Sequence, residues 1–400
     1  MKDLIQKSFQ TRAVHAGERA PAADYTPVST PIYPSVGYLY ESMDDMDAVF
    51  AGAKQGYVYS RYATPTVSAF EAAVASLEGA EAAQAYSSGM AAIHAALLAA
   101  GVKAGASVVA ALDLYGATFT LLRSLLASLG VNVRMVDASD LEDVAAALAE
   151  TQPAALLVET ISNPLLKVAD VPALAALAHR HGASLLVDNT FASPYLFNPL
   201  AHGADYVIHS ATKYLSGHGD VLAGVVAASA ENKNKLYEMN KLIGGVLGPF
   251  EAWLALRGLK TLPLRMRQQC QNAQRVAEWL NSHPRVSKVN YPGLPVHPQH
   301  DLAERLFEGK GSGGVLSFEI KDADKATAYR FMEALTLCLP ATTLGDIYSL
   351  VLHPATSSHR SLTAEERLRI GIPDSLLRLS TGIESADDIL ADLESALARL

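Results

Sequence analysis

The sequence has few cysteines, no block of basic residues and no long apolar run, and each shortage excludes a class of protein. Its two cysteines, Cys270 and Cys338, form neither a C-x-x-C pair nor a disulfide framework, which is typical of a reducing compartment. Acidic residues (41) outnumber basic ones (32), so we expect neither a nucleic-acid partner nor an anionic membrane surface. No apolar stretch reaches membrane-spanning length, and residues 1–12 lack a signal-peptide core. These features predict a soluble, cytoplasmic protein that acts on a metabolite.

Half of the residues are apolar, so the chain can bury a large core and form more than one domain. Apolar, β-branched runs near positions 107, 133, 155, 184, 206 and 222 alternate with helical patterns such as 171–181. This alternation predicts an α/β fold in which β-α-β units build a parallel sheet with helices on both faces.

An arm and two domains are the predicted organisation. Residues 1–60 hold prolines at 21, 27, 31 and 34 with little periodicity, which indicates an extended arm. A large domain is expected over 61–256 and a smaller carboxyl-terminal domain over 257–400, linked by a helix that begins at Pro249 and runs past Met266. Helical patterns at 268–281, 324–335 and from 385, with strand patterns at 314–320, 348–352 and 376–380, predict an α+β layer in the smaller domain.

The stretch from Ala204 to Asp220 presents one lysine at the end of a buried strand. Residues 206–208 predict the strand, and the small polar turn after it carries Lys213 together with Ser210 and Thr212. A lysine is a nucleophile only when its amine is neutral, and partial desolvation at a strand end lowers its pKa. Lys213 is therefore a candidate Schiff-base former, although taken alone it would more often be a surface lysine.

A second apolar strand, over 184–190, delivers Asp188 at its carboxyl end, where open α/β sheets place ligand contacts. A carboxylate there can face the ring nitrogen of pyridoxal phosphate while Lys213 holds the aldehyde. Two charges about 4 Å apart in a partly screened site attract by about 4 kcal/mol, enough to keep the ring nitrogen protonated. The two residues together predict a pyridoxal-phosphate site.

Two further segments could bind an anion. Ser87, Ser88 and Gly89 precede an Ala-rich helix, which indicates an anion site at the helix start or simple N-capping. Tyr59 and Arg61 lie in an aromatic-rich segment, where arginine is a good bidentate phosphate partner but more often makes an ordinary salt bridge.

Three more candidate residues stand at or in apolar strands. Tyr115 follows a strand at 107–112, a position where an aromatic is more often core. Asn163 precedes a proline and could equally form an Asx-turn. Arg378 lies within the apolar run 376–380, where a buried arginine needs an anionic partner.

With these segments, VDNT at 187–190 and HSATKYLSGHGD at 209–220 resemble the Cys/Met-metabolism family of pyridoxal-phosphate enzymes. That family includes cystathionine γ-lyase, cystathionine γ-synthase, methionine γ-lyase and the O-acylhomoserine sulfhydrylases. The resemblance extends from Thr11 to the last helix. It implies fold type I, pyridoxal 5'-phosphate (PLP) as cofactor, an amino-acid substrate, and a homodimer with shared active sites that pairs into a tetramer.

The resemblance also assigns roles to residues. Catalysis falls to Lys213, Tyr115 and Asp188, with Tyr115 stacking on the cofactor ring. Cofactor binding is implied for Tyr59, Arg61, Ser88, Gly89, Met90, Tyr115, Asp188, Ser210, Thr212 and Lys213, of which Tyr59 and Arg61 reach the phosphate of the neighbouring subunit. Substrate binding is implied for Asn163, Thr343, Tyr348 and Arg378, and no metal is expected.

Departures from the family pattern bear on the reaction. Ala117 stands where methionine γ-lyases typically have cysteine, and Tyr348 replaces an acidic residue common in the cystathionine enzymes. The context 117–119 is nearest to methionine γ-lyase, whereas 248–253 is nearer to the sulfhydrylases. We predict γ-elimination on sulfur-substituted homoserines, giving 2-oxobutanoate, ammonia and a thiol. The alternative is γ-replacement on O-acetyl- or O-succinylhomoserine.

Other motifs and classes fit less well. Ser210 to Lys213 matches S-x-x-K but lacks the SDN and KTG partners, and the glycine-rich stretch 309–314 precedes a strand instead of a helix. His297, His300 and Asp301 predict a solvated turn, not a metal site. An aminotransferase would share Lys213 but release no ammonia, and a regulator would need a DNA-binding module for which no length remains.

Overall fold

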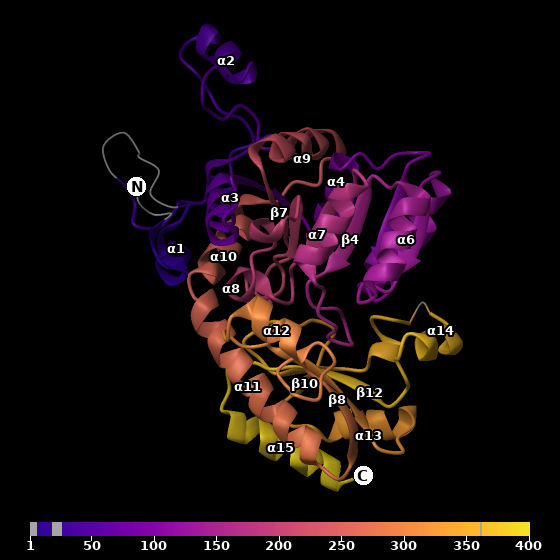
Figure 1. Ribbon diagram of the computed structural model, residues 1–400. Coiled ribbons are helices and arrows are strands. Elements are labelled where there is room, and N and C mark those ends of the chain that lie inside the picture. The colour runs from indigo at the N-terminus through magenta and orange to yellow at the C-terminus, as the bar shows by residue number, and fades with distance from the viewer. Residues whose placement is uncertain (1–5, 18–25, 361) are drawn as a thin grey trace.

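The computed structural model describes residues 6–17, 26–360 and 362–400 (Figure 1). The parts of the predicted arm at 1–5 and 18–25, Pro21 included, lie outside the described residues. In the described part of the chain, no helix is long and apolar enough to cross a membrane.

A seven-stranded sheet in the order β1-β7-β6-β5-β4-β2-β3 forms the larger layer. Its strands are β1 (Ala82–Tyr86), β2 (Ser107–Ala111), β3 (Asn132–Val136), β4 (Ala155–Glu159), β5 (Ser184–Asp188), β6 (Tyr206–Ser210) and β7 (Gly224–Ala228). Strands β2 to β6 are parallel, and β7 and β1 add antiparallel pairs at one edge. The mostly parallel sheet is thus confirmed. The sequence analysis missed β1, because AAQAY lacks the β-branched residues that mark a strand.

Helices flank this sheet. They are α3 (Pro65–Glu78), α4 (Gly89–Ala99), α5 (Gly116–Thr120) with its π-helical continuation Leu121–Leu126, α6 (Leu141–Thr151), α7 (Val171–Arg180), α8 (Ser193–Leu196), α9 (Ala230–Ile243) and α10 (Pro249–Leu259). The core strands are almost fully apolar; β7 and β4, for example, are buried along their whole length. Burial on both faces is what parallel strands between two helical layers require.

A second, five-stranded sheet in the order β10-β11-β12-β9-β8 lies at the opposite end of the molecule (Figure 1). Its strands are β8 (Val286–Asn290), β9 (Val315–Ile320), β10 (Leu339–Pro340), β11 (Leu350–Leu352) and β12 (Leu376–Ser380). The helices of this region are α11 (Leu262–Ser282), α12 (His300–Phe307), α13 (Lys325–Ala334), α14 (Ala364–Arg369) and α15 (Ala386–Ala398). Sequence patterns had predicted β9, β11, β12, α13, α15 and most of α11, but not β8, β10, α12 or α14. The domain boundaries at 60 and 256 remain predictions.

The predicted single helix from Pro249 past Met266 is wrong, because the helix stops and restarts between α10 and α11. Pro263 stands in the first turn of α11, where its missing N–H is harmless, whereas inside one continuous helix it would remove the hydrogen bond to the carbonyl of Leu259. Arg265 seals the break by donating from Nη2 to the Gly258 carbonyl at 2.9 Å and from Nη1 to the Tyr214 carbonyl at 2.8 Å.

The arm is more structured than its prolines predicted. It contains α1 (Phe9–His15), whose Ala13 is buried in the main core, and α2 (Met43–Phe50), which has no buried residue and projects from the body (Figure 1). The arm also exposes large apolar side chains, including Leu39 at 99% and Met43 at 73%. Exposed apolar residues gathered on one segment are typical of a contact surface.

The segment around His297 is not the solvated turn that its prolines predicted. His297 is buried, and His300 begins α12 and donates from Nδ1 to the Pro292 carbonyl at 2.9 Å. The run that follows His300 places its apolar residues on one face, which turns the segment into a helix against the core. The described residues contain no cluster of side chains that could hold a metal. Cys270 and Cys338 are both free and buried.

Candidate active site

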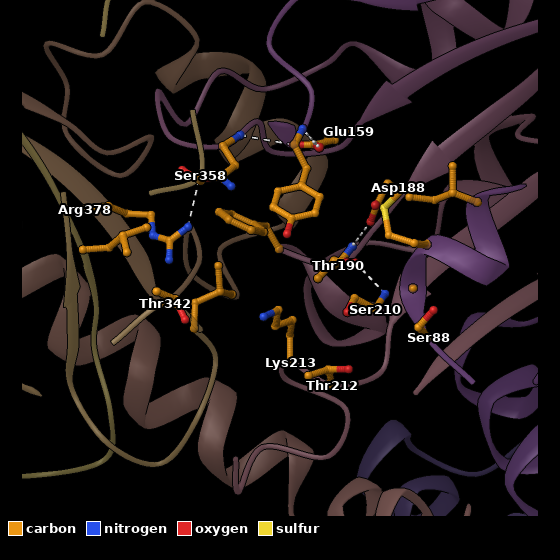
Figure 2. Close-up of a pocket in the computed structure, with 18 of the residues that line it drawn as sticks. Ser88, Glu159, Asp188, Thr190, Ser210, Thr212, Lys213, Thr342, Ser358 and Arg378 are labelled. Atoms are coloured by element: carbon orange, nitrogen blue, oxygen red, sulfur yellow. Dashed lines mark hydrogen bonds between the residues drawn. The ribbon is translucent and has the colours of Figure 1, made fainter. Parts of the chain in front are cut away.

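A cavity of about 420 Å³ opens where β4, β5 and β6 end and where the second sheet comes close (Figure 2). The cavity brings together ten of the predicted site residues: Ser88, Gly89, Met90, Tyr115, Asn163, Asp188, Ser210, Thr212, Lys213 and Arg378. Because parallel strands end at one edge of a sheet, residues far apart in the sequence meet there.

Lys213 lies in the tight turn that follows β6, with its N–H donated to the Ser210 carbonyl at 3.1 Å. Its Nζ donates to Thr343 Oγ1 at 2.9 Å, and in the view of Figure 2 it lies between Arg378 and Ser210. Burial and the positive charge of Arg378 together lower the pKa of Lys213 to about 8, against the opposing effect of the Asp346 carboxylate. At pH 7 about a tenth of this amine is therefore neutral, far more than for an ordinary lysine with a pKa of about 10.4, and the neutral form is the nucleophile.

Asp346 gives the first testable consequence. The amine of Lys213 is charged below its pKa, and Asp346 stabilises the charged form, so Asp346→Asn is expected to lower the pKa of Lys213 below about 8. At pH 7 the substitution then increases the neutral fraction of the amine. We expect the pH profile for capture of added pyridoxal phosphate by the protein, followed by absorbance, to move to lower pH. Glu308→Gln, at an exposed site, is the control, and an unmoved Asp346→Asn profile would contradict the argument.

Asp188 ends β5 and lines the cavity. Its Oδ1 accepts the N–H of Thr190 at 3.0 Å, and Thr190 Oγ1 in turn accepts the N–H of Ser210 at 2.8 Å (Figure 2). Burial raises the pKa of Asp188, while the Thr190 hydrogen bonds and the nearby His209 act in the opposite direction. A nearby cation, such as a protonated ring nitrogen, would stabilise the charged form of this carboxylate against the effect of burial.

The start of α4 contributes hydrogen-bond donors to the cavity. Ser88 caps the helix by accepting the Ala91 N–H at 3.1 Å, which leaves the first-turn N–H groups of Gly89 and Met90 for a ligand. A Cβ at Gly89 would lie 2.9 Å from Ser210 Cβ, so the close approach of α4 to β6 requires glycine. Ser210 adds a hydroxyl, whereas the Thr212 hydroxyl donates to the Ala223 carbonyl at 3.2 Å and accepts its N–H at 3.0 Å. The donor set fits a phosphate dianion.

Arg378 is the clearest anion-binding group of the cavity. It is only 3% exposed, yet Nη1 donates to the neutral Asn163 Oδ1 at 3.0 Å and Nη2 to the Thr343 carbonyl at 3.1 Å. Among the described residues no carboxylate pairs with it, and its Nε has no partner. Burial lowers the pKa of Arg378 to about 10, so the group stays charged. A buried cation with only neutral partners is suited to a ligand carboxylate.

Four predicted site residues, Tyr59, Arg61, Thr343 and Tyr348, lie outside the cavity lining, but Thr343 is hydrogen-bonded to both Lys213 and Arg378. The Arg61 guanidinium stacks on the rings of Tyr59 and Tyr62, at 5.3 and 5.2 Å from their centroids, and donates to the Lys241 carbonyl. Tyr59 is 40% exposed and Tyr348 is 49% exposed. One chain alone does not bring these residues to the cavity.

The sequence analysis missed Glu159, Thr190 and Ser358, all of which line the cavity. Glu159 carried a usable signal, since an acidic residue at the end of an otherwise apolar strand occupies the same kind of position as Asp188. Thr190 and Ser358 carried none, because small hydroxyl residues are common in loops.

Solved structures share this architecture. A crystal structure of cystathionine γ-lyase from Lactobacillus plantarum, complexed with L-serine, superposes with a TM-score of 0.91 and 38% sequence identity, covering 98% of this chain and 99% of that one. The protein therefore has the fold of type I PLP-dependent enzymes, as the sequence predicted.

The match in sequence is equally extensive. The model of the Cys/Met metabolism PLP-dependent enzyme family covers residues 10–398, and the chain belongs to that family. An L-methionine γ-lyase from Porphyromonas gingivalis is 42% identical over 100% of this chain and 99% of its own length. An O-succinylhomoserine sulfhydrylase from Pseudomonas aeruginosa is also 42% identical, over 100% of this chain and 97% of its own. The protein is thus a PLP-dependent enzyme of the carbon–sulfur lyase or replacement type.

Proposed function

We propose that the protein catalyses γ-elimination on sulfur-substituted homoserine amino acids, releasing 2-oxobutanoate, ammonia and a thiol. The observation that carries the proposal is one cavity in which a lysine of lowered pKa lies near a buried arginine with only neutral protein partners. The arginine suits an α-carboxylate, and the lysine suits the proton transfers at Cα and Cβ that elimination requires. Relatives named for γ-elimination, such as the L-methionine γ-lyase, support the same choice.

Each wall of the cavity has a proposed task. Lys213 would bind the cofactor covalently and then move protons, and Asp188 would hold the ring nitrogen protonated. Bound PLP supplies an electron sink for the negative charge that develops at Cα. The start of α4, with Ser210 and Thr212, would hold the phosphate, and Tyr115 would lie against the ring and pass a proton to the leaving group.

The residues proposed to bind the substrate carboxylate lie on or next to the second sheet. Arg378 would clamp the α-carboxylate, with Asn163 fixing the guanidinium through its 3.0 Å hydrogen bond and the segment at Thr343 holding it from the other side. Tyr348 would shape the entrance for the distal part of the substrate. Its phenol offers no negative charge, so we expect a distal ammonium group to be bound poorly.

We further propose a homodimer, paired into a tetramer, in which Tyr59 and Arg61 complete the phosphate site of the neighbouring subunit. Their position outside the cavity of their own chain and the exposed apolar side chains of the arm support this arrangement. The cytoplasmic location stays the prediction made from composition.

Arg61 tests the shared site. Arg61→Ala is expected to raise the dissociation constant for PLP by about tenfold or more, because a charged hydrogen bond to phosphate is lost. Fluorescence or absorbance titration of the cofactor-free protein measures it. Arg305→Ala, which breaks only the surface pair with Asp170, is the matched control. Unchanged cofactor affinity would count against the cross-subunit contact.

A second candidate function is γ-replacement on an O-acetyl- or O-succinylhomoserine. The specific observation in its favour is that the sulfhydrylase from Pseudomonas aeruginosa is as similar to this chain as the methionine γ-lyase is. Segment 248–253 also leans toward the sulfhydrylases in sequence.

One experiment separates the two reactions. Methionine, cystathionine, cysteine and O-acetylhomoserine are supplied with and without an added thiol, and 2-oxobutanoate and thioether are both measured. We expect 2-oxobutanoate from methionine without thiol. Thioether formation with no 2-oxobutanoate from any substrate would establish replacement and reject elimination.

A further inference from the structure

The carboxyl group of Glu159 joins two loops of the cavity. Glu159 ends β4, is 8% exposed and lines the cavity. Its Oε1 accepts the N–H of Tyr115 at 2.7 Å, and its Oε2 accepts the N–H of Asn163 at 3.2 Å (Figure 2). One side chain therefore fixes both the loop that carries the aromatic ring and the loop that carries the partner of Arg378.

The charges around Glu159 are mostly negative. Asp188 is its register neighbour on β5, and Asp113 follows β2 nearby. Lys167 lines the same small recess as Glu159 and Asp113, but it pairs with Asp137 at 3.0 Å. Burial and the two aspartates raise the pKa of Glu159 well above its usual value, with the two backbone N–H groups opposing them. The two backbone N–H groups thus favour the charged form of Glu159, against burial and the two aspartates.

We propose that Glu159 is a positioning residue: by holding the backbones of Tyr115 and Asn163 on one carboxyl group, it sets the cofactor-facing ring and the carboxylate clamp in register. The proposal rests on the proposed function, because these two residues matter to catalysis only if the cavity holds PLP and an amino acid. The side chain of Glu159 binds the backbone N–H groups of Tyr115 and Asn163, so its effect on the reaction is exerted through the positions of these two residues.

The test compares Glu159→Gln with Glu159→Ala in the holoenzyme. Glutamine keeps one acceptor oxygen and loses one of the two bonds, whereas alanine loses both. We expect a graded effect, with the KM for the amino acid raised about tenfold per lost bond and the visible circular dichroism of bound PLP weakened in the same order. Circular dichroism of the bound cofactor reads the ring environment without turnover.

A matched control comes from Glu71, another glutamate that accepts a backbone N–H, from Ala85 at 2.8 Å, but lies outside the cavity lining. Burial raises the pKa of Glu71 to about 7, so both glutamates are removed from water, although the charged neighbour of Glu71 is Lys233 and not an aspartate. Glu71→Gln is expected to lower thermal stability without altering KM or the circular dichroism of PLP.

The outcomes separate the two proposals. Glu159 variants that match wild type in KM and in circular dichroism, or that change only in thermal stability as Glu71→Gln does, would overturn the positioning role alone. A wild-type protein that binds PLP but forms neither 2-oxobutanoate nor thioether would overturn the proposed function. The circular dichroism of PLP in the Glu159 variants would still decide the positioning role.

Discussion

Lys213→Ala is expected to lower turnover by at least about 10³-fold, because it removes the residue proposed both to attach PLP covalently and to move protons. The visible absorbance of lysine-bound cofactor should disappear, while phosphate contacts from α4 and Ser210 still bind PLP weakly. Absorbance spectra and 2-oxobutanoate release measure the two effects. The partner of Lys213, Thr343 Oγ1, also loses a 2.9 Å hydrogen bond.

Lys310→Ala provides the control for Lys213, since that lysine is at the surface and pairs with Glu308 at 3.0 Å. It should leave both absorbance and turnover unchanged. Turnover retained by Lys213→Ala would show that the amine at position 213 is not the acid–base group, and the proposed chemistry would fall with it.

Arg378→Ala should reduce kcat/KM for the amino acid by about 10²-fold or more, since truncating one partner of a buried charged pair typically costs about 2–5 kcal/mol. The affinity for PLP should change little, because Arg378 lies on the substrate side of the cavity. Steady-state kinetics and cofactor titration of the same preparation measure both quantities.

Arg378→Lys refines the result. Lysine keeps the charge but not the planar fork that bonds Asn163 and Thr343 together, so we expect only partial rescue of kcat/KM. Full activity in Arg378→Ala would mean that the substrate carboxylate binds elsewhere.

The features that could be predicted well are those determined by a short stretch of consecutive residues. Apolar, β-branched runs located β5 and β6, and Lys213 and Asp188 stood out because each follows such a run. The N-terminus of α4 was marked by Ser88 and Gly89. Where a strand is built from alanine and glutamine, as β1 is, the same rule gives no signal.

Contacts between distant segments could not be predicted in this way. The bond from Lys213 to Thr343 joins positions 130 residues apart, and that from Arg378 to Asn163 joins positions 215 residues apart. The neutral setting of Arg378 and the double hydrogen bond of Glu159 are likewise products of packing. Local patterns identified which side chains could do chemistry, whereas the folded chain determines which of them meet.

Thr343 links the two sides of the cavity. Its hydroxyl holds the ammonium of Lys213 and its carbonyl holds the guanidinium of Arg378, so a single residue mechanically ties the large sheet to the small one. The amine and the guanidinium, one beside each sheet, are thus hydrogen-bonded to the same residue, so a substitution at position 343 would displace both ends of the cavity together.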